Sequence, residues 1–410
     1  MTAKLIRHSD QLALVGAPTS AGVAAKGVEN GPETLRSAGI IDRLREVGYQ
    51  VTDGGDLPVQ LPQADPENPR ARNLKGILAV LEPLRLRIEQ SAKAHAFPLV
   101  LGGDVTVAVA LVAALRRQVP TLGLIHIGRH ADLHTPTHTE DGIVAPMTVS
   151  HLIGQGAAEL VRFWKEPPLV REPDLALFGL AEPDTIDRER LGSLAVRRFP
   201  IEKVRREGAR TTAEAALDSL RAANRDFVVL LLADVFSPDE VPGGARATAG
   251  GLSVAEVGEA LYCFAARRTF AGLAICGYDP ALDPERRGAQ TLVRLVAESM
   301  AARHTALIQP PVEPESEARV KERSASAERK PKHEKAAQAP VDAELKPEAN
   351  AEPESQPRPE TERAMEAETA AAPLAGEEAG ELRTGASNAT ATSSPAAPDL
   401  DEPEPGNGNA

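Results

Sequence analysis

The sequence has little of what disulfide-stabilised, redox or membrane proteins require. Only two cysteines occur in 410 residues. Cys263 and Cys276 each lie in an apolar run, which favours small buried thiols over a disulfide framework or a redox CxxC pair. No apolar run approaches the roughly 18 residues of a transmembrane helix, and the N-terminus lacks a long apolar segment followed by a cleavage site. These absences predict a protein of the reducing cytoplasm, without a membrane partner.

Aromatic residues and positive charge are also scarce, and they are distributed unevenly. All the aromatics (8 Phe, 3 Tyr and 1 Trp) occur at or before Tyr278. From Gln309 to the end there are 22 acidic against 11 basic residues. A stretch without aromatics that is rich in Pro, Glu, Ala and Ser cannot bury enough apolar surface to offset its ordering entropy. We therefore predict a globular domain over 1–308 and a disordered acidic tail over 309–410, which either solubilises the chain or docks a protein partner.

The charge balance bears on the partners of the globular part. Most of the formal net charge of −13 belongs to the acidic tail, so the first 308 residues are close to neutral. Proteins that bind nucleic acid or anionic membranes normally carry a basic surplus. We expect neither as a partner.

Short apolar runs recur along the first 308 residues and stop at Gly, Pro or Asp, as is typical of strands buried on both faces. Helical patterns lie between them: one over 31–48 begins near Pro32 and ends at Gly48, and another begins with Ser253 and Glu256 as a capping box. This alternation predicts a single doubly wound, parallel α/β sheet flanked by helices, with ligands beyond the carboxyl ends of the strands. The expected strands are "QLALVGAP", "FPLVLGG", "TLGLIHIG", "DLALFGLA", "DFVVLLLADVF" and "FAGLAICGY".

The stretch "LIHIGRHADLHTPTH", Leu124 to His138, contains four of the nine histidines, spaced by four residues. On a helix they would form one stripe. However, "LIHIG" is typical of a strand, and Pro136 is incompatible with a helix interior. We therefore predict a strand end followed by a loop, which is where sites form in this architecture. The four are His126, His130, His134 and His138.

Residues from about 12 to 303 resemble the ureohydrolases, the arginase and agmatinase superfamily, and most closely arginase itself. "LVLGGDVT" lies where the family has GGDHS, and "HADLHTP" where arginase has HTDINTP. "ADVFSPDEVPGG" matches SFDVDxxDP, and "GLAICGYDPALDP" matches a segment that ends in EVNPxxD. The resemblance implies an arginase-like three-layer fold. It also implies two Mn²⁺ ions bridged by a hydroxide that attacks a guanidinium carbon.

The resemblance implies six positions for metal ligands. A residue-by-residue comparison shows that this sequence keeps the ligand at three of them. By this analogy neither ion would have more than two protein ligands, whereas a catalytic ion is usually held by about three. The residual ligands are His130, Asp132 and Asp234. The other three positions are occupied by Val105, Gly128 and Phe236.

The positions that would handle the substrate are altered as well. Arginase's proton-shuttling histidine matches Ala145, and its guanidinium-binding glutamate matches Gly277. Asp184 matches an aspartate that recognises the α-amino group of the substrate. His134 matches an asparagine that contacts the substrate carboxylate. If a small molecule binds, the resemblance implies one similar to arginine.

Two functional hypotheses follow. The first is a non-hydrolytic member of the superfamily, a pseudoenzyme with a binding or interaction role and no firmly held cofactor. The alternative is a metal-dependent hydrolase of a guanidino or amidino C–N bond that releases urea. It would use Mn²⁺ in a rearranged site, with His134 joining the residual ligands. In either case the resemblance suggests a homo-oligomer, a trimer or a hexamer.

Overall fold

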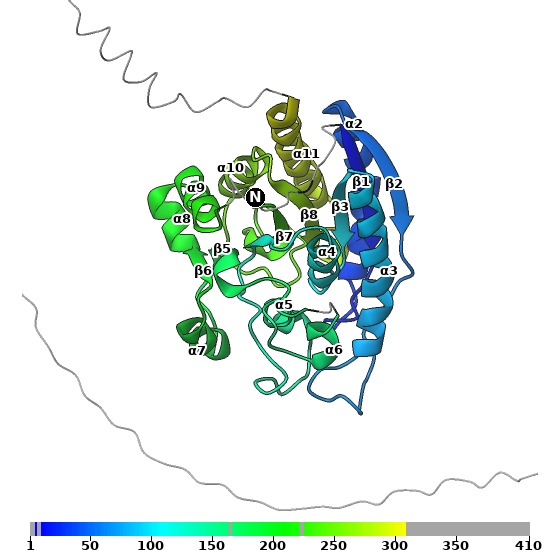
Figure 1. Ribbon diagram of the computed structural model, residues 1–410, viewed down its shortest axis with the longest axis vertical. Coiled ribbons are helices and arrows are strands. Elements are labelled where there is room, and N and C mark those ends of the chain that lie inside the picture. Colours follow the sequence, from blue (N-terminus) through cyan, green and yellow to red (C-terminus); the bar gives the residue numbers. More distant parts are fainter. Residues whose placement is uncertain (1–4, 6–9, 164–165, 222–224, 309–410) are drawn as a thin grey trace, which may run out of the picture. The chain divides into compact units, whose positions relative to one another are not determined.

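The computed structural model describes residue 5 and residues 10–163, 166–221 and 225–308, so the predicted acidic tail lies outside the described residues. The described chain forms one eight-stranded sheet in which every pair of neighbouring strands is parallel (Figure 1). Its strand order is β2-β1-β3-β8-β7-β4-β5-β6. The strands are β1 (Gln11–Ala17), β2 (Gln50–Asp56), β3 (Phe97–Gly102), β4 (Gly123–Ile127), β5 (Leu175–Leu180), β6 (Arg197–Pro200), β7 (Phe227–Leu232) and β8 (Phe270–Cys276).

The predicted parallel α/β sheet is confirmed, and its six apolar strands are those expected from the sequence. The sequence pattern did not predict β2 and β6, which form the two edges of the sheet. Edge strands bury less surface, and both are rich in exposed polar residues. They therefore lack the continuous apolar run by which buried parallel strands are recognised.

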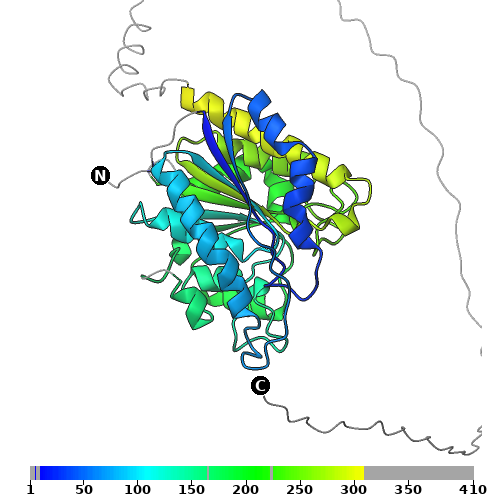
Figure 2. The same cartoon turned by 90° about the vertical axis from the view of Figure 1, so that its right-hand side faces the viewer.

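Helices cover both faces of the sheet (Figure 2). On one face, α3 to α7 contribute buried residues to one apolar core; on the other, α1, α2 and α8 to α11 contribute to a second. The first set is α3 (Leu74–Lys93), α4 (Val107–Arg116), α5 (Thr148–Leu152), α6 (Ala158–Val161) and α7 (Thr185–Ser193). The second is α1 (Gly31–Ser37), α2 (Ile40–Glu46), α8 (Ile201–Glu207), α9 (Ala209–Ser219), α10 (Val254–Ala265) and α11 (Arg287–Ile308). Short 3₁₀ turns are η1 (Val28–Asn30), η2 (Ala145–Met147), η3 (Glu172–Asp174), η4 (Ala233–Val235) and η5 (Pro280–Leu282).

Three local predictions can be compared with these elements. The single helix expected over 31–48 is wrong: it is two helices, because Gly39 between them takes a left-handed conformation with φ 89°. The capping box of Ser253 and Glu256 is present at the start of α10. Cys263 and Cys276 are free and buried, as expected. Within the described ranges, no helix is both long and apolar enough to cross a bilayer.

The sheet order explains where a site can form. β3, β8, β7 and β4 are consecutive neighbours at the centre of the sheet. In parallel strands the carboxyl ends all lie at one edge, so the segments that follow these four strands converge. Those segments carry Val105 after β3, Gly277 after β8, Asp234 after β7 and Gly128 after β4. Positions far apart in the sequence are thus brought to one place.

Candidate functional site

The four histidines are separated by the fold, as the strand-and-loop prediction requires. His126 lies in β4 and is fully buried. His130, His134 and His138 follow in the irregular segment before η2. His138 shares a hydrogen bond at Nδ1 with the hydroxyl of Thr135, 2.7 Å away. It takes part in no cluster of ligand-type side chains among the residues that the structure describes. The fourfold spacing is therefore not a shared ligand set.

Asp132 is held by a cation that belongs to the chain itself. Its carboxylate is fully buried and accepts two hydrogen bonds from the guanidinium of Arg246, at 2.9 Å from Nη1 and 3.4 Å from Nη2. A third partner is Nε2 of His126, 3.3 Å from Oδ2. This two-pronged contact between guanidinium and carboxylate is a strong, geometrically defined form of ion pair.

The same guanidinium reaches a second carboxylate. Nη2 of Arg246 lies 3.4 Å from Oδ2 of Asp234, whose side chain is only 4% exposed. Asp234 follows β7 in the turn η4 and also accepts a hydrogen bond from the backbone N–H of Arg129. Nε2 of His130 is 3.9 Å from the same carboxylate. Arg246 therefore links Asp132 to Asp234, and His130 lies beside Asp234.

The electrostatics follow from this arrangement. Burial by itself raises the pKa of Asp132, but Arg246 and His126 outweigh burial and hold that pKa well below its usual range. Burial lowers the pKa of Arg246, yet Asp132 and Asp234 together raise it above its usual value. Burial, with help from Arg246, lowers the pKa of His130, so its imidazole is neutral near pH 7. The Asp132 carboxylate and the Arg246 guanidinium are thus both charged.

The three replaced positions are filled by apolar groups. Val105 is buried beside the carboxyl end of β3. At Gly128 a Cβ atom would lie 2.5 Å from Cδ1 of Leu232 and 2.7 Å from Cε1 of His126, so neighbouring side chains already occupy that space. Phe236 is fully buried in the apolar core on the α10 face. None of the three residues has a side chain that can act as a metal ligand.

A small cavity remains where the substrate positions converge. Ala145 and Gly277 line it together with Val105, Asp234 and Arg246, and its volume is about 40 Å³. The cavity has room for only a few water molecules, because one water needs roughly 10–15 Å³ of cavity volume. An amino acid the size of arginine cannot enter the cavity in this conformation.

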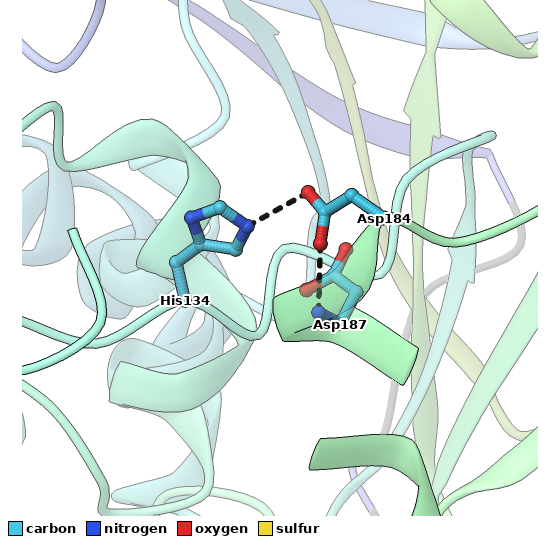
Figure 3. Close-up of side chains that lie close together, drawn as sticks. All are labelled: His134, Asp184 and Asp187. Atoms are coloured by element: carbon cyan, nitrogen blue, oxygen red, sulfur yellow. Dashed lines mark hydrogen bonds and ion pairs between the residues drawn. The ribbon is translucent and has the colours of Figure 1, made fainter. Parts of the chain in front are cut away.

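A second polar cluster lies farther along the same loop, where His134 meets the start of α7 (Figure 3). His134 Nε2 is 2.9 Å from Oδ2 of Asp184. The other oxygen of Asp184 accepts a hydrogen bond from the backbone N–H of Asp187, so Asp184 is the N-cap of α7. The structure thus brings together the two predicted substrate-binding residues, His134 and Asp184, and pairs them with each other.

Asp187 completes this cluster and was not singled out from the sequence. Ligand-type atoms of His134, Asp184 and Asp187 lie within 4.8 Å of one another, and no other such group of three occurs among the described residues. Asp187 accepts hydrogen bonds from the backbone N–H groups of Leu133 and Ala131, at 3.0 and 3.3 Å. Burial, reinforced by Asp132 and Asp184, raises the pKa of Asp187 to about 6. Its main observable role is to fix the loop that carries Asp132.

Arg246 is the central residue that sequence reasoning missed. It lies in the glycine-rich segment "VPGGARATAGG" that follows Asp234. The sequence did contain a signal for such a residue. Asp132 and Asp234 were expected to lie in a site that no longer holds metal ions firmly, and buried anions require a cation nearby. A search for an unassigned basic residue in the segments after the central strands would have found Arg246.

The comparisons with known proteins agree with this fold. A family model described as "Arginase family" matches residues 10–302. The arginase of Staphylococcus aureus (strain COL) is 29% identical over 287 residues, which cover 69% of this chain and 94% of that protein. The arginase of Brevibacillus brevis is 28% identical, covering 70% of this chain and 96% of that protein. The crystal structure of Bacillus caldovelox arginase superposes with a TM-score of 0.68 at 25% identity, covering 71% of this chain and 98% of that one.

Replacing Arg246 by Met should destabilise the protein by on the order of 3 kcal/mol at pH 7, because two buried carboxylates lose their counter-charge. Urea unfolding measures this change. The matched control is Arg188→Met, which breaks an exposed ion pair with Glu182 (2.7 Å) and should cost no more than about 1 kcal/mol.

The loss should also depend on pH. Because the folded-state pKa of Asp132 is depressed, the stability contributed by the pair is present above the ordinary aspartate pKa of about 3.9 and is lost as the pH falls further. The difference in the free energy of unfolding between wild type and Arg246→Met should therefore become smaller toward pH 3. If this difference is absent at pH 7, or if it grows in acid, the assigned role of Arg246 is contradicted.

Proposed function

This chain belongs to the arginase family, and we propose that within it the chain is a non-hydrolytic member, a pseudoenzyme with a binding role. The observation that carries the proposal is the contact of one guanidinium with both Asp132 and Asp234. In this proposal Arg246 supplies the positive charge that the family resemblance assigns to metal ions.

Charge supports the proposal. A pair of divalent ions needs several anionic ligands to offset its four positive charges. Here Asp132 and Asp234 are the only carboxylates of the three residual ligands, and Arg246 already neutralises one of their two charges. A cation entering between them would have to displace the guanidinium from hydrogen bonds at 2.9 and 3.4 Å.

The available metal-ligand atoms and the available space also support a non-hydrolytic function. Val105 and Phe236 offer only carbon, and the position of Gly128 is crowded by Leu232 and His126. Mn²⁺ prefers carboxylate, carbonyl and water oxygens, in octahedral geometry. The residues present do not fit the pair of metal ions that the family resemblance implies. With Ala145 and Gly277 at the proton-shuttle and guanidinium positions, no side chain there can transfer a proton or hold a guanidinium.

One observation supports a second candidate, a hydrolase of a guanidino or amidino C–N bond with a rearranged metal site. It is the proximity of ligand-type atoms of His134, Asp184 and Asp187 within 4.8 Å. Each of the three already has a partner in the chain: His134 and Asp184 have each other, and Asp187 has two backbone N–H groups. We therefore favour the non-hydrolytic function.

The purified full-length protein, incubated with Mn²⁺, Zn²⁺ or Fe²⁺ and desalted, should retain far less than one ion per chain, and it should release no urea from arginine or agmatine. Elemental analysis and a colorimetric urea assay measure the two quantities on the same sample. An arginase from the family serves as the positive control. Stoichiometric metal together with urea release would overturn the proposal and favour the hydrolase.

Removal of the internal cation should create affinity for a divalent ion. Arg246→Ala removes the guanidinium between the carboxylates of Asp132 and Asp234 and leaves His130 beside Asp234, so we expect at least a tenfold gain in Mn²⁺ or Zn²⁺ affinity over wild type. Isothermal titration measures it, with Arg188→Ala as the charge-matched control. If Arg246→Ala binds metal no better than wild type, Arg246 is not what excludes the ions.

A further inference from the structure

A cavity of about 260 Å³ lies next to the small cavity at the candidate site, and the two share Val23 as a lining residue. Four segments line it: 21–24 after β1, 62–64 and 72–73 before α3, and 142–144 before η2. Its volume is just below the roughly 300 Å³ at which ligand pockets for drug-sized molecules begin. The cavity is therefore of a size for a small metabolite.

Arg72 is the one charged side chain that lines this cavity among the described residues. Its Nε atom is buried and has no hydrogen-bond partner. No carboxylate of the described chain lies within ion-pairing distance of its guanidinium. A buried donor on a permanently charged group is costly to leave unpaired, so it indicates an acceptor that the chain does not supply.

The surroundings of Arg72 are fixed and already satisfied. Its backbone N–H donates to the carbonyl of Gly142 at 2.8 Å. Asp141, the neighbouring acid on that loop, accepts hydrogen bonds from the Thr139 hydroxyl at 2.8 Å and the Ile143 N–H at 3.0 Å. These hydrogen bonds lie within its own loop, and Arg72 acts on the carboxylate only through space, where it helps to hold the pKa of Asp141 below its usual range. The guanidinium of Arg72 stays available at the cavity wall.

The chemistry of the lining selects the ligand class. A guanidinium presents Nε and one Nη side by side, in a geometry that matches the two oxygens of a carboxylate. With one positive charge and apolar neighbours such as Val23, Ile143 and Val144, the cavity suits a monoanion with a short apolar body. A phosphate dianion would lack a second cation.

We infer that this cavity binds a small carboxylate through Arg72. The inference deepens the binding role proposed above, and it places the ligand beside the small cavity at the Arg246 site instead of inside it. It is tested by binding alone, so its outcome is separate from that of the urea and metal assays. Hydrolytic activity, if found, would overturn the proposed function but leave the result for Arg72 unaffected.

The test uses butyrate as the probe, titrated into the full-length protein and followed by NMR or calorimetry. Butyrate should bind saturably to wild type, and uncharged butyramide and inorganic phosphate should each bind at least tenfold more weakly. Arg72→Gln should weaken butyrate binding at least tenfold. The matched control Arg43→Gln removes an equal charge from an exposed ion pair with Glu46 (3.0 Å) and should leave binding unchanged.

A second variant tests the cavity independently of the charge. Ala64→Phe keeps Arg72 but fills the space from an exposed lining position, so it should also abolish butyrate binding. The inference is overturned if wild type does not bind butyrate, if butyramide or phosphate binds as tightly, or if Arg72→Gln binds butyrate as wild type does. It is equally overturned if Ala64→Phe retains full affinity.

Discussion

The site depends on one requirement, that two carboxylates buried at the carboxyl ends of neighbouring strands need a positive charge close by. Asp132 and Asp234 follow β4 and β7, which are adjacent in the sheet, so the fold itself brings them together. Unpaired charges at such positions would be strongly destabilising. Arg246 meets the requirement from within the chain, by a guanidinium that contacts both. The neighbouring apolar positions can then pack as an ordinary core.

In the second cluster, which contains His134, Asp184 and Asp187, the polar groups are likewise paired within the chain. His134 and Asp184 occupy positions that the family resemblance assigns to a bound amino acid, and here they pair with each other at 2.9 Å. Asp187 is satisfied by the backbone of the loop that it supports. Each anion of the candidate site thus has a partner in the chain itself. Arg72 differs, because its buried Nε has no partner in the described chain.

The fold was largely predictable, because apolar strands of a parallel sheet leave continuous runs in the sequence. The edge strands β2 and β6 lack such runs. The break at Gly39 falls within a pattern that also fits one continuous helix, so neither feature could be recognised from pattern alone. In the site, the losses at Val105, Gly128 and Phe236 are visible residue by residue, and His134 and Asp184 were singled out. Arg246 and Asp187 were missed because their contacts depend on segments that are 114 and 54 residues apart in the chain, and no local pattern reports such a contact.

The central claim is that a guanidinium, and not a metal ion, joins Asp132 to Asp234. The most direct test is a crystal structure of the full-length protein grown with excess Mn²⁺, with anomalous diffraction recorded to locate manganese. The account predicts continuous density for Arg246 between the two carboxylates and no anomalous peak within reach of His130, Asp132 or Asp234. A manganese peak ligated by these residues, with Arg246 displaced into solvent, would contradict it.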